Sequence, residues 1–221
     1  MLKALLLVDL QNDFMPGGAL AVPNGHEVVP LANQLMPFFD IVIATQDFHP
    51  AHHKSFASEH PGKNPGDIII LEGIEQILWP DHCIQNQSGS KLVDNLEISS
   101  IHAIFHKGTD LKIDSYSAFF DNGHRHSTEL DVFLKSKNVG AVFLLGLATD
   151  YCVKYSALDA QHLGFSTHVI IDACRPVEIN AGDCQKAIDD MKKAGINIAT
   201  SEQILQKHQP LQRDDNAAQS S

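Results

Sequence analysis

The chain has 221 residues, of which 43% are hydrophobic and 19% are charged, and its formal net charge at pH 7 is −11. The hydrophobic share fills a core and excludes a largely disordered chain, and the acidic balance excludes binding to nucleic acid through clustered Lys and Arg. The length allows one to two domains, and a single α/β domain over residues 1–206 fits it.

Short apolar runs alternate with helical patterns along the chain. Apolar runs that end in polar residues predict buried strands, and apolar residues at helical spacing predict the helices between them. Strands are expected at residues 3–8, 41–45, 101–105, 141–147, 167–171 and 196–199. Helices are expected at residues 27–39, 128–137, 149–163 and 180–194, with a short one after residue 200. This alternation predicts a mainly parallel sheet with helices on both faces.

Two stretches break the alternation. Residues 49–100 are rich in Gly, Pro and His and only weakly periodic, and an irregular region of that length inside a compact domain is usually functional. Residues 207–221 form a polar tail that we expect to be disordered.

Thr149 and Ser201 are the predicted N-caps of the third helix and of the last one.

Membrane insertion and secretion are not expected. The longest apolar stretch, residues 140–148, is far shorter than the roughly 20 residues of a membrane-spanning helix. Asp9 interrupts the apolar N-terminal run too early for a signal peptide. The four cysteines contain no CxxC pair, which is typical of reduced thiols. We therefore expect a cytoplasmic protein with no membrane partner.

Reactive side chains follow several predicted strands directly. Asp9 follows the first strand, Asp47 and His49 follow the second, Lys107 follows the third, and Cys152 follows the fourth. Ligands of open parallel sheets bind outside the carboxyl ends of the strands. These five side chains are therefore expected to meet at one edge of the sheet.

Cys152 is the predicted nucleophile. It lies in the first turn of a predicted helix, where the helix dipole and a nearby Lys107 would lower the pKa of the thiol. Asp9 could accept the thiol proton and later deliver it to a leaving group, and free N–H groups near residues 148–152 could hold an oxyanion. An isolated buried cysteine is more often a small core residue, and the shared strand-end placement of Asp9 and Lys107 is what favours catalysis.

A metal site is predicted from a carboxylate and two imidazoles. Asp47 and His49 are two residues apart, which places both on the same face of a strand, and His82 comes from the irregular region. These ligands suit Zn²⁺, Fe²⁺ or Mn²⁺ with open positions for a ligand or water. His53 lies nearer than the other histidines and is left either as a further ligand or as a group that supports the ligands. Phe14, Trp79 and Tyr116 could wall a pocket, although packing in the core is the commoner fate of aromatic residues.

Five sequence blocks together resemble the nicotinamidases, a branch of the isochorismatase-like cysteine hydrolases. The blocks occur in family order within residues 1 to about 206, and they read LVDLQNDF, QDFHP, WPDHC, FHKG and GLATDYCV. The resemblance implies a three-layer α/β/α fold with a six-stranded sheet in the order 3-2-1-4-5-6. It implies hydrolysis of nicotinamide to nicotinate and ammonia in NAD salvage, and commonly of pyrazinamide.

The resemblance also assigns roles to residues. Cys152 matches the nucleophile, Asp9 the proton shuttle and Lys107 the third catalytic group. Asp47, His49 and His82 match the ligands of one divalent metal ion, for which zinc is favoured and iron or manganese are alternatives. The remaining matches are pocket residues at Phe14, Trp79, Tyr116 and Ala148, an oxyanion hole at Ala148 and Cys152, and a cis peptide bond between Leu147 and Ala148.

Some positions depart from the family pattern, and other functions remain open. Asn86 and Pro176 stand where many relatives have Gly, which affects the local loop geometry. The expected partner is a small-molecule substrate for a monomer or small homo-oligomer. The alternatives are a cysteine hydrolase for another small amide, such as an N-carbamoyl compound, and a metal-bearing binding module without turnover. Reactivity of Cys152 with iodoacetamide near neutral pH would separate the enzymes from the binding module.

Overall fold

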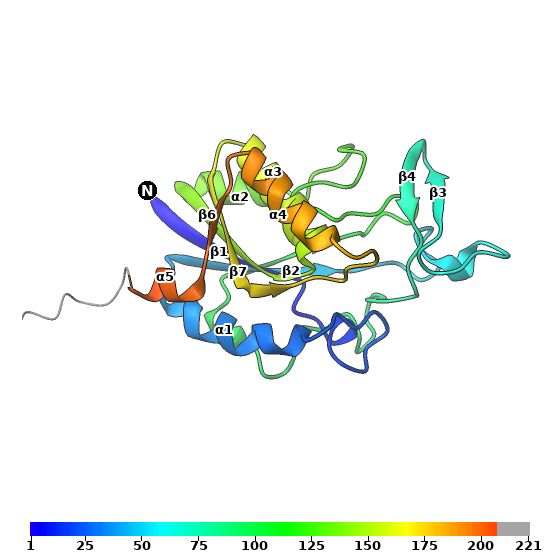
Figure 1. Cartoon of the computed structure of the whole chain (residues 1–221), viewed down its shortest axis with the longest axis horizontal. Coiled ribbons are helices and arrows are strands. Elements are labelled where there is room, and N and C mark those ends of the chain that lie inside the picture. Colours follow the sequence, from blue (N-terminus) through cyan, green and yellow to red (C-terminus); the bar gives the residue numbers. More distant parts are fainter. Residues whose placement is uncertain (207–221) are drawn as a thin grey trace, which may run out of the picture.

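The computed structural model describes residues 1–206, and the predicted tail at residues 207–221 lies outside the described residues. Within the described part, six strands form one sheet in the order β5-β2-β1-β6-β7-β8, with helices on both faces (Figure 1). Numbered in chain order, these six strands run 3-2-1-4-5-6, and every neighbouring pair is parallel. The predicted three-layer α/β fold and its strand order are confirmed.

Each predicted strand is present, with ends that differ by a few residues. The inner strands are buried on both faces, which is why they read as continuous apolar runs and not as alternating patterns. The strands of the sheet are β1 (Leu2–Val8), β2 (Ile41–Asp47), β5 (Ala103–Lys107), β6 (Val139–Leu147), β7 (Ser166–Arg175) and β8 (Asn197–Ala199).

The helices divide between the two faces (Figure 1). One face carries α1 (Val28–Leu35) and α5 (Ser201–Gln206), and the other carries α2 (Leu130–Ser136), α3 (Lys154–His162) and α4 (Asp183–Lys193). The first helix is shorter than predicted because a 3₁₀ turn precedes it and another, Met36–Phe38, follows it. Pro37 lies in that second turn, and proline has no N–H to continue an α-helix.

The cap of α5 is one residue earlier than predicted. Thr200 Oγ1 accepts a hydrogen bond from the Gln203 N–H at 3.3 Å, and Gln203 Oε1 accepts one from the Thr200 N–H at 3.0 Å. This reciprocal pair is a capping box, so Thr200 and not Ser201 caps the helix. The Ser201 hydroxyl instead donates to Asp172, on β7.

The region expected to be irregular contains an antiparallel hairpin. Its strands are β3 (Ile68–Leu71) and β4 (Ile74–Ile77), which form a separate two-stranded sheet at one end of the molecule (Figure 1). The connecting residues Glu72 and Gly73 both have positive φ angles, of 51° and 88°, as a tight two-residue hairpin turn requires. The strands have four residues each and no alternating pattern, so periodicity does not reveal them.

The carboxyl ends of the central strands meet at one edge of the sheet. Asp47 on β2 pairs in register with Lys107 on β5, and Val8 on β1 pairs with Gly146 on β6. A side chain at Gly146 would place its Cβ 2.2 Å from the Val8 carbonyl oxygen, so only glycine allows these strands to approach here. No described helix has both the length and the apolar character that crossing a bilayer requires.

Candidate active site

The predicted strand-end residues lie together in the structure. Asp9 follows β1, Asp47 ends β2, Lys107 ends β5, and Cys152 lies in the turn after β6. These are four neighbouring strands of the sheet, in the spatial order β5-β2-β1-β6. All four side chains are buried. The convergence predicted from the sequence is therefore present.

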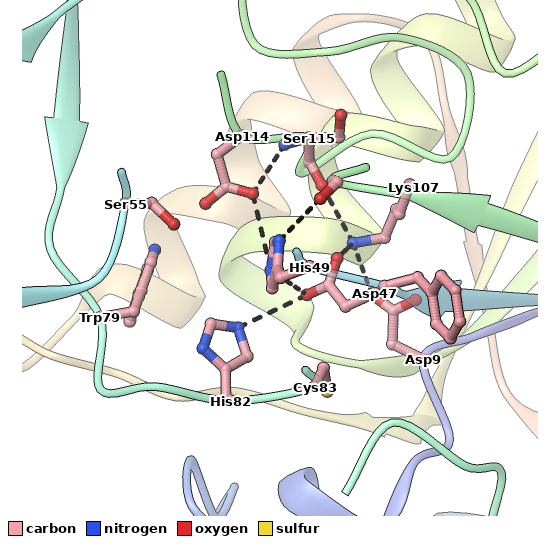
Figure 2. A network of polar contacts seen from close by, with 12 residues as sticks. Asp9, Asp47, His49, Ser55, Trp79, His82, Cys83, Lys107, Asp114 and Ser115 are labelled. Carbon is pink, nitrogen blue, oxygen red and sulfur yellow. Dashed lines mark hydrogen bonds and ion pairs between the residues drawn. The ribbon is translucent and has the colours of Figure 1, made fainter. Parts of the chain in front are cut away.

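Lys107 is at the centre of this cluster (Figure 2). Its Nζ lies 2.9 Å from Asp9 Oδ2, 2.5 Å from Asp47 Oδ1 and 3.3 Å from Cys152 Sγ, and it donates to the Ser115 carbonyl at 3.0 Å. Burial by itself lowers the pKa of Lys107, but the carboxylates of Asp47 and Asp9 outweigh burial and hold this pKa well above its ordinary value. Lys107 is therefore a permanent cation beside the thiol.

Asp9 is held by the end of the neighbouring strand. Its backbone turns into the left-handed region, with φ at 52°. The Asp9 N–H donates to Thr45 Oγ1 at 3.2 Å, and the Thr45 hydroxyl donates to Asp9 Oδ1 at 2.6 Å. Burial raises the pKa of Asp9, Lys107 opposes that rise, and the Asp47 carboxylate adds to it. A carboxyl with a raised pKa is suited to accept and return a proton.

Cys152 lies in a π-helical turn, Thr149–Val153, that leads into α3. Its Sγ lies within 4.8 Å of a carboxylate oxygen of Asp9 and of Asp47. The predicted lowering of the thiol pKa is wrong: burial raises this pKa well above its ordinary value, and Lys107 offsets only part of the rise. The sulfur is therefore a thiol at rest, and its proton needs an acceptor during catalysis.

The predicted capping role of Thr149 is also wrong. Ala148 is the N-cap residue of this turn, and it makes no side-chain cap. The Ala148 carbonyl accepts hydrogen bonds from the N–H groups of Tyr151 and Val153 at 3.1 and 3.0 Å. Thr149 is itself the first residue of the turn, and its buried hydroxyl has no hydrogen-bond partner among residues 1–206. The expected cis peptide bond between Leu147 and Ala148 is present.

The three predicted metal ligands face one another (Figure 2). Asp47 Oδ2 lies 3.7 Å from His49 Nε2 and 3.7 Å from His82 Nε2. The Nδ1 atoms of His49 and His82 contact the carbonyls of Gly108 and Pro80, at 2.9 and 2.8 Å. A carbonyl only accepts hydrogen bonds, so each Nδ1 carries a proton and donates it, which leaves the Nε2 of each ring facing Asp47.

This donor set fits a divalent ion. A carboxylate oxygen and two imidazole nitrogens suit zinc and its neighbours among the transition metals. The His49 Nε2 is buried and has no hydrogen-bond partner in the part of the chain that the structure describes, as expected for an atom that coordinates a metal ion. Burial opposes ionisation of Asp47, but Lys107 and His49 hold its pKa well below its ordinary value, so it is a carboxylate. A side chain at Gly108 would overlap the His49 ring, with its Cβ 2.4 Å from Cε1.

His53 lies beside His49, with 4.5 Å between the ring centroids. It does not share the set formed by Asp47, His49 and His82 but forms a second candidate set with His49 and Asp114. Its Nδ1 contacts the Ser55 hydroxyl at 2.8 Å, and burial lowers its pKa. Sequence reasoning missed Asp114, which follows no strand and belongs to no recognisable spacing.

A small cavity of about 30 Å³ adjoins the thiol. All four residues predicted to bind substrate line it together with Cys152, and these are Phe14, Trp79, Tyr116 and Ala148. Sequence reasoning missed other lining residues, which are Leu20, Val22, Asp114, Tyr151 and Val177. The sequence does contain a signal for Tyr151, because it is an aromatic residue next to the predicted nucleophile. It contains none for the apolar loop residues, since their sequence cannot be distinguished from that of core residues.

The two positions that depart from the family pattern are accommodated locally. Asn86 has a φ angle of 64°, a left-handed conformation that glycine favours and that asparagine tolerates. After Pro176, the N–H groups of Val177 and Glu178 donate to the Asp150 carboxylate at 3.0 and 2.7 Å. Asp150, at the start of the Cys152 turn, therefore holds this loop against the cavity.

Comparison with known proteins agrees with the fold and with the sequence blocks. The family model described as the isochorismatase domain matches residues 3–203. A nicotinamidase from Escherichia coli is 50% identical over 202 residues, which cover 90% of this chain and 94% of that protein.

Two solved structures extend the comparison. An Acinetobacter baumanii nicotinamidase and pyrazinamidase superposes with a TM-score of 0.89 at 42% identity, covering 91% of this chain and 97% of that one. A pyrazinamidase of Pyrococcus horikoshii in complex with zinc superposes with a TM-score of 0.73 at 33% identity, covering 90% of this chain and 99% of that one. The chain therefore belongs to the isochorismatase family, and within it to the nicotinamidase branch.

Proposed function

We propose that this chain hydrolyses nicotinamide to nicotinate and ammonia through a thioester on Cys152, and that it also hydrolyses pyrazinamide. The observation that carries this proposal is the junction at Lys107, where one buried ammonium contacts Asp9, Asp47 and the thiol beside an aromatic-walled cavity. The names of the E. coli and A. baumanii relatives support the substrates. In this role the chain would supply nicotinate for NAD salvage.

The first half of the reaction forms the thioester. Asp9 accepts the proton of the Cys152 thiol as the sulfur attacks the carboxamide carbon, and the C–S bond forms. Backbone N–H groups of Ala148 and Cys152 receive the oxyanion of the tetrahedral intermediate. The C–N bond then breaks, and Asp9 returns its proton to the leaving nitrogen, which departs as ammonia. The raised pKa of Asp9 suits it to hold this proton between the two transfers.

The second half hydrolyses the thioester. Asp9, again a carboxylate, takes a proton from a water molecule that attacks the acyl carbon. The C–S bond breaks, nicotinate is released, and Asp9 returns the proton to the sulfur. Lys107 stays an ammonium throughout, because its pKa is raised. It stabilises the thiolate whenever that forms, and its 2.9 Å contact holds the Asp9 carboxylate in place.

The metal site would orient the substrate. Asp47, His49 and His82 would hold one divalent ion, with zinc favoured by the zinc complex of the P. horikoshii relative and iron or manganese also compatible with these ligands. When bound, this ion supplies a Lewis acid for the ring nitrogen of the substrate. Phe14, Trp79 and Tyr116 would then flank the ring and exclude water from the thiol.

Ammonia release from nicotinamide, by the wild type and by Cys152→Ala, tests this proposal. Hydrolysis by the wild type alone is expected, with Cys152→Ala at least about 10³-fold slower, as for other lost nucleophiles. The variant should unfold at the same urea concentration as the wild type, so that lost activity is not lost fold. Turnover by Cys152→Ala at more than a few per cent of the wild-type rate would contradict the covalent route. If the wild type hydrolysed a different small amide but not nicotinamide, the proposed substrate would be wrong and Cys152 would remain the proposed nucleophile.

A further inference from the structure

The hairpin formed by β3 and β4 contacts the candidate active site through one buried residue. Ile68 and Ile70, on β3, are 59% and 68% exposed, so this strand faces solvent. Among the eight residues of the two strands, all of them described, Gln76 alone is buried, with 1% of its surface exposed. A buried amide on an exposed hairpin is unfavourable unless its hydrogen bonds are satisfied.

The Gln76 amide is satisfied by the neighbouring Ile77 carbonyl and by three residues of the segment after β5. Its Nε2 donates to the Tyr116 hydroxyl at 2.9 Å and to the Ile77 carbonyl at 2.7 Å, and it lies 3.4 Å from Asp114 Oδ2. Its Oε1 accepts from Asn122 Nδ2 at 3.2 Å. Three of these partners belong to the segment after β5, which contributes Tyr116 to the cavity.

Gln76 thereby holds Tyr116 at both ends. The direct hydrogen bond fixes the hydroxyl, which also accepts from Trp79 Nε1 at 3.2 Å. At the other end, Asn122 Oδ1 accepts the Tyr116 backbone N–H at 2.9 Å, and Gln76 holds Asn122. The position of the Tyr116 ring therefore depends on the hairpin.

Tyr116 also lines two cavities. The inner cavity, beside Cys152, has a volume of about 30 Å³, and the outer cavity, of about 170 Å³, is lined by Tyr116 together with Tyr155 and Asp159. An aromatic ring the size of benzene occupies a cavity of about 150 Å³. The inner cavity must widen to hold such a ring, and the outer cavity offers room for Tyr116 to move.

We propose that Gln76 is a positioning residue that sets the width of the ring cavity through Tyr116, and so selects single six-membered rings over larger ones. This inference rests on the proposed function, because it takes the inner cavity as the site of the substrate ring. Gln76 touches neither the thiol nor Asp9, so its loss should change ring binding and leave the chemical steps intact.

Steady-state kinetics of Gln76→Leu with nicotinamide and with quinoline-3-carboxamide test this inference. Loss of the hydrogen bond that holds the Tyr116 hydroxyl predicts a KM for nicotinamide about fivefold higher, with kcat within about twofold of wild type. The kcat/KM ratio of the two-ring amide to nicotinamide should rise about tenfold. Ile70→Thr, on the exposed face of the same hairpin, should leave the KM and kcat for both substrates unchanged. A fall in kcat with an unchanged substrate ratio would overturn the inference, since that is the signature of a general loss of folded enzyme.

A double-mutant cycle identifies the route of the effect. If Gln76 acts through the hydroxyl, Gln76→Leu should change the substrate ratio by less than about twofold in a Tyr116→Phe background. If Gln76→Leu changed the substrate ratio as much in that background as in the wild type, the proposed action through the Tyr116 hydroxyl would be wrong. Should Gln76→Leu fail to fold, Tyr116→Phe breaks the same hydrogen bond from its other end and should shift the ratio in the same direction.

Nicotinate binding measured by calorimetry keeps this test separate from the proposed function. The fall in affinity should be about fivefold in Gln76→Leu, even for a chain that does not turn nicotinamide over. Wild-type binding without turnover would contradict the proposed function alone, whereas unchanged affinity in Gln76→Leu would contradict the role of Gln76.

Discussion

The ammonium of Lys107 contacts two buried carboxylates and a buried thiol. The sequence predicts the meeting of these groups, because each follows a strand of a parallel sheet. It does not predict the protonation of Cys152, since burial raises the pKa of that thiol more than Lys107 lowers it. The burial of Cys152 depends on loops that come from distant parts of the chain, so the local sequence around Cys152 does not reveal it.

Replacing Lys107 with an apolar residue should destabilise the fold as well as stop catalysis. In Lys107→Met, Asp9 and Asp47 stay buried without their cation, and breaking such a buried pair costs about 3–5 kcal/mol. Urea unfolding in the presence of a chelator measures this loss without a metal contribution. Lys54→Met is the control, because it removes a partly exposed partner of Glu59 and should cost at most about 1 kcal/mol. Similar losses in both variants would contradict the importance of the buried charge.

Gln11 holds the backbone of a proposed metal ligand. Its Nε2 donates to the Asp47 carbonyl and its Oε1 accepts the Asp47 N–H, both at 2.8 Å. Support of this kind is worth about 10- to 100-fold in metal affinity, so Gln11→Met should weaken zinc binding by at least about tenfold in a competition with a chromophoric chelator. Gln46→Met is a matched control, because Gln46 and Gln11 both donate to the Ser90 carbonyl and only Gln11 also bonds the Asp47 backbone. Equal zinc affinities in the two variants would refute this role.

At the scale of elements, the sequence predicts the regular framework and misses the loops that complete the site. The inner strands are continuous apolar runs and the helices repeat apolar residues at helical spacing, and the structure contains both. The β3–β4 hairpin has no such period, because its outer face exposes isoleucines instead of polar residues. The segment after β5, which carries Asp114 and Tyr116, is irregular and is held by side-chain hydrogen bonds that have no sequence signature.

Asp121 organises that segment. Its carboxylate accepts hydrogen bonds from the N–H groups of Gly123, Arg125 and His126 at 2.8–3.0 Å. Burial opposes ionisation of Asp121, but these backbone donors outweigh it and lower the pKa. A carboxyl with a lowered folded pKa stabilises the fold above the pKa of the unfolded chain, and that contribution is lost as the pH falls through the folded pKa.

Asp121→Asn should therefore destabilise the protein in a pH-dependent way. The variant presents an NH₂ group to backbone donors, so we expect it to lose about 1–3 kcal/mol at pH 7, and the difference from wild type should shrink at pH 3. Urea unfolding at the two pH values measures both effects. Asp131→Asn, which removes an exposed pair with Lys135 on α2, should change stability by at most about 0.5 kcal/mol at either pH. A difference for Asp121→Asn that stays constant with pH would contradict the ionic contribution.

At the scale of the whole molecule, the proposed metal site joins two parts that the sheet does not connect. Asp47 and His49 extend from the end of β2, whereas His82 belongs to the irregular region that also carries Trp79 and the hairpin. The two-residue spacing of Asp47 and His49 at the end of a predicted strand predicts the first pair. The placement of His82 depends on how the long segment returns to the sheet, and no periodicity encodes that return.

A bound ion should consequently stabilise the whole fold and strengthen substrate binding. A ligand that binds only the folded state stabilises it by about 2.7 kcal/mol when its concentration is 100 times its Kd. Zinc should therefore raise the Tm of the wild type, and this shift should vanish in His82→Ala and persist in His126→Ala, whose imidazole lies on the surface. In metal-free protein, the KM for nicotinamide should rise while kcat changes less, because the thiol, Asp9 and Lys107 stay in place. Identical kinetics with and without metal would refute the proposed orienting role, and a Tm shift retained by His82→Ala would place the ion elsewhere.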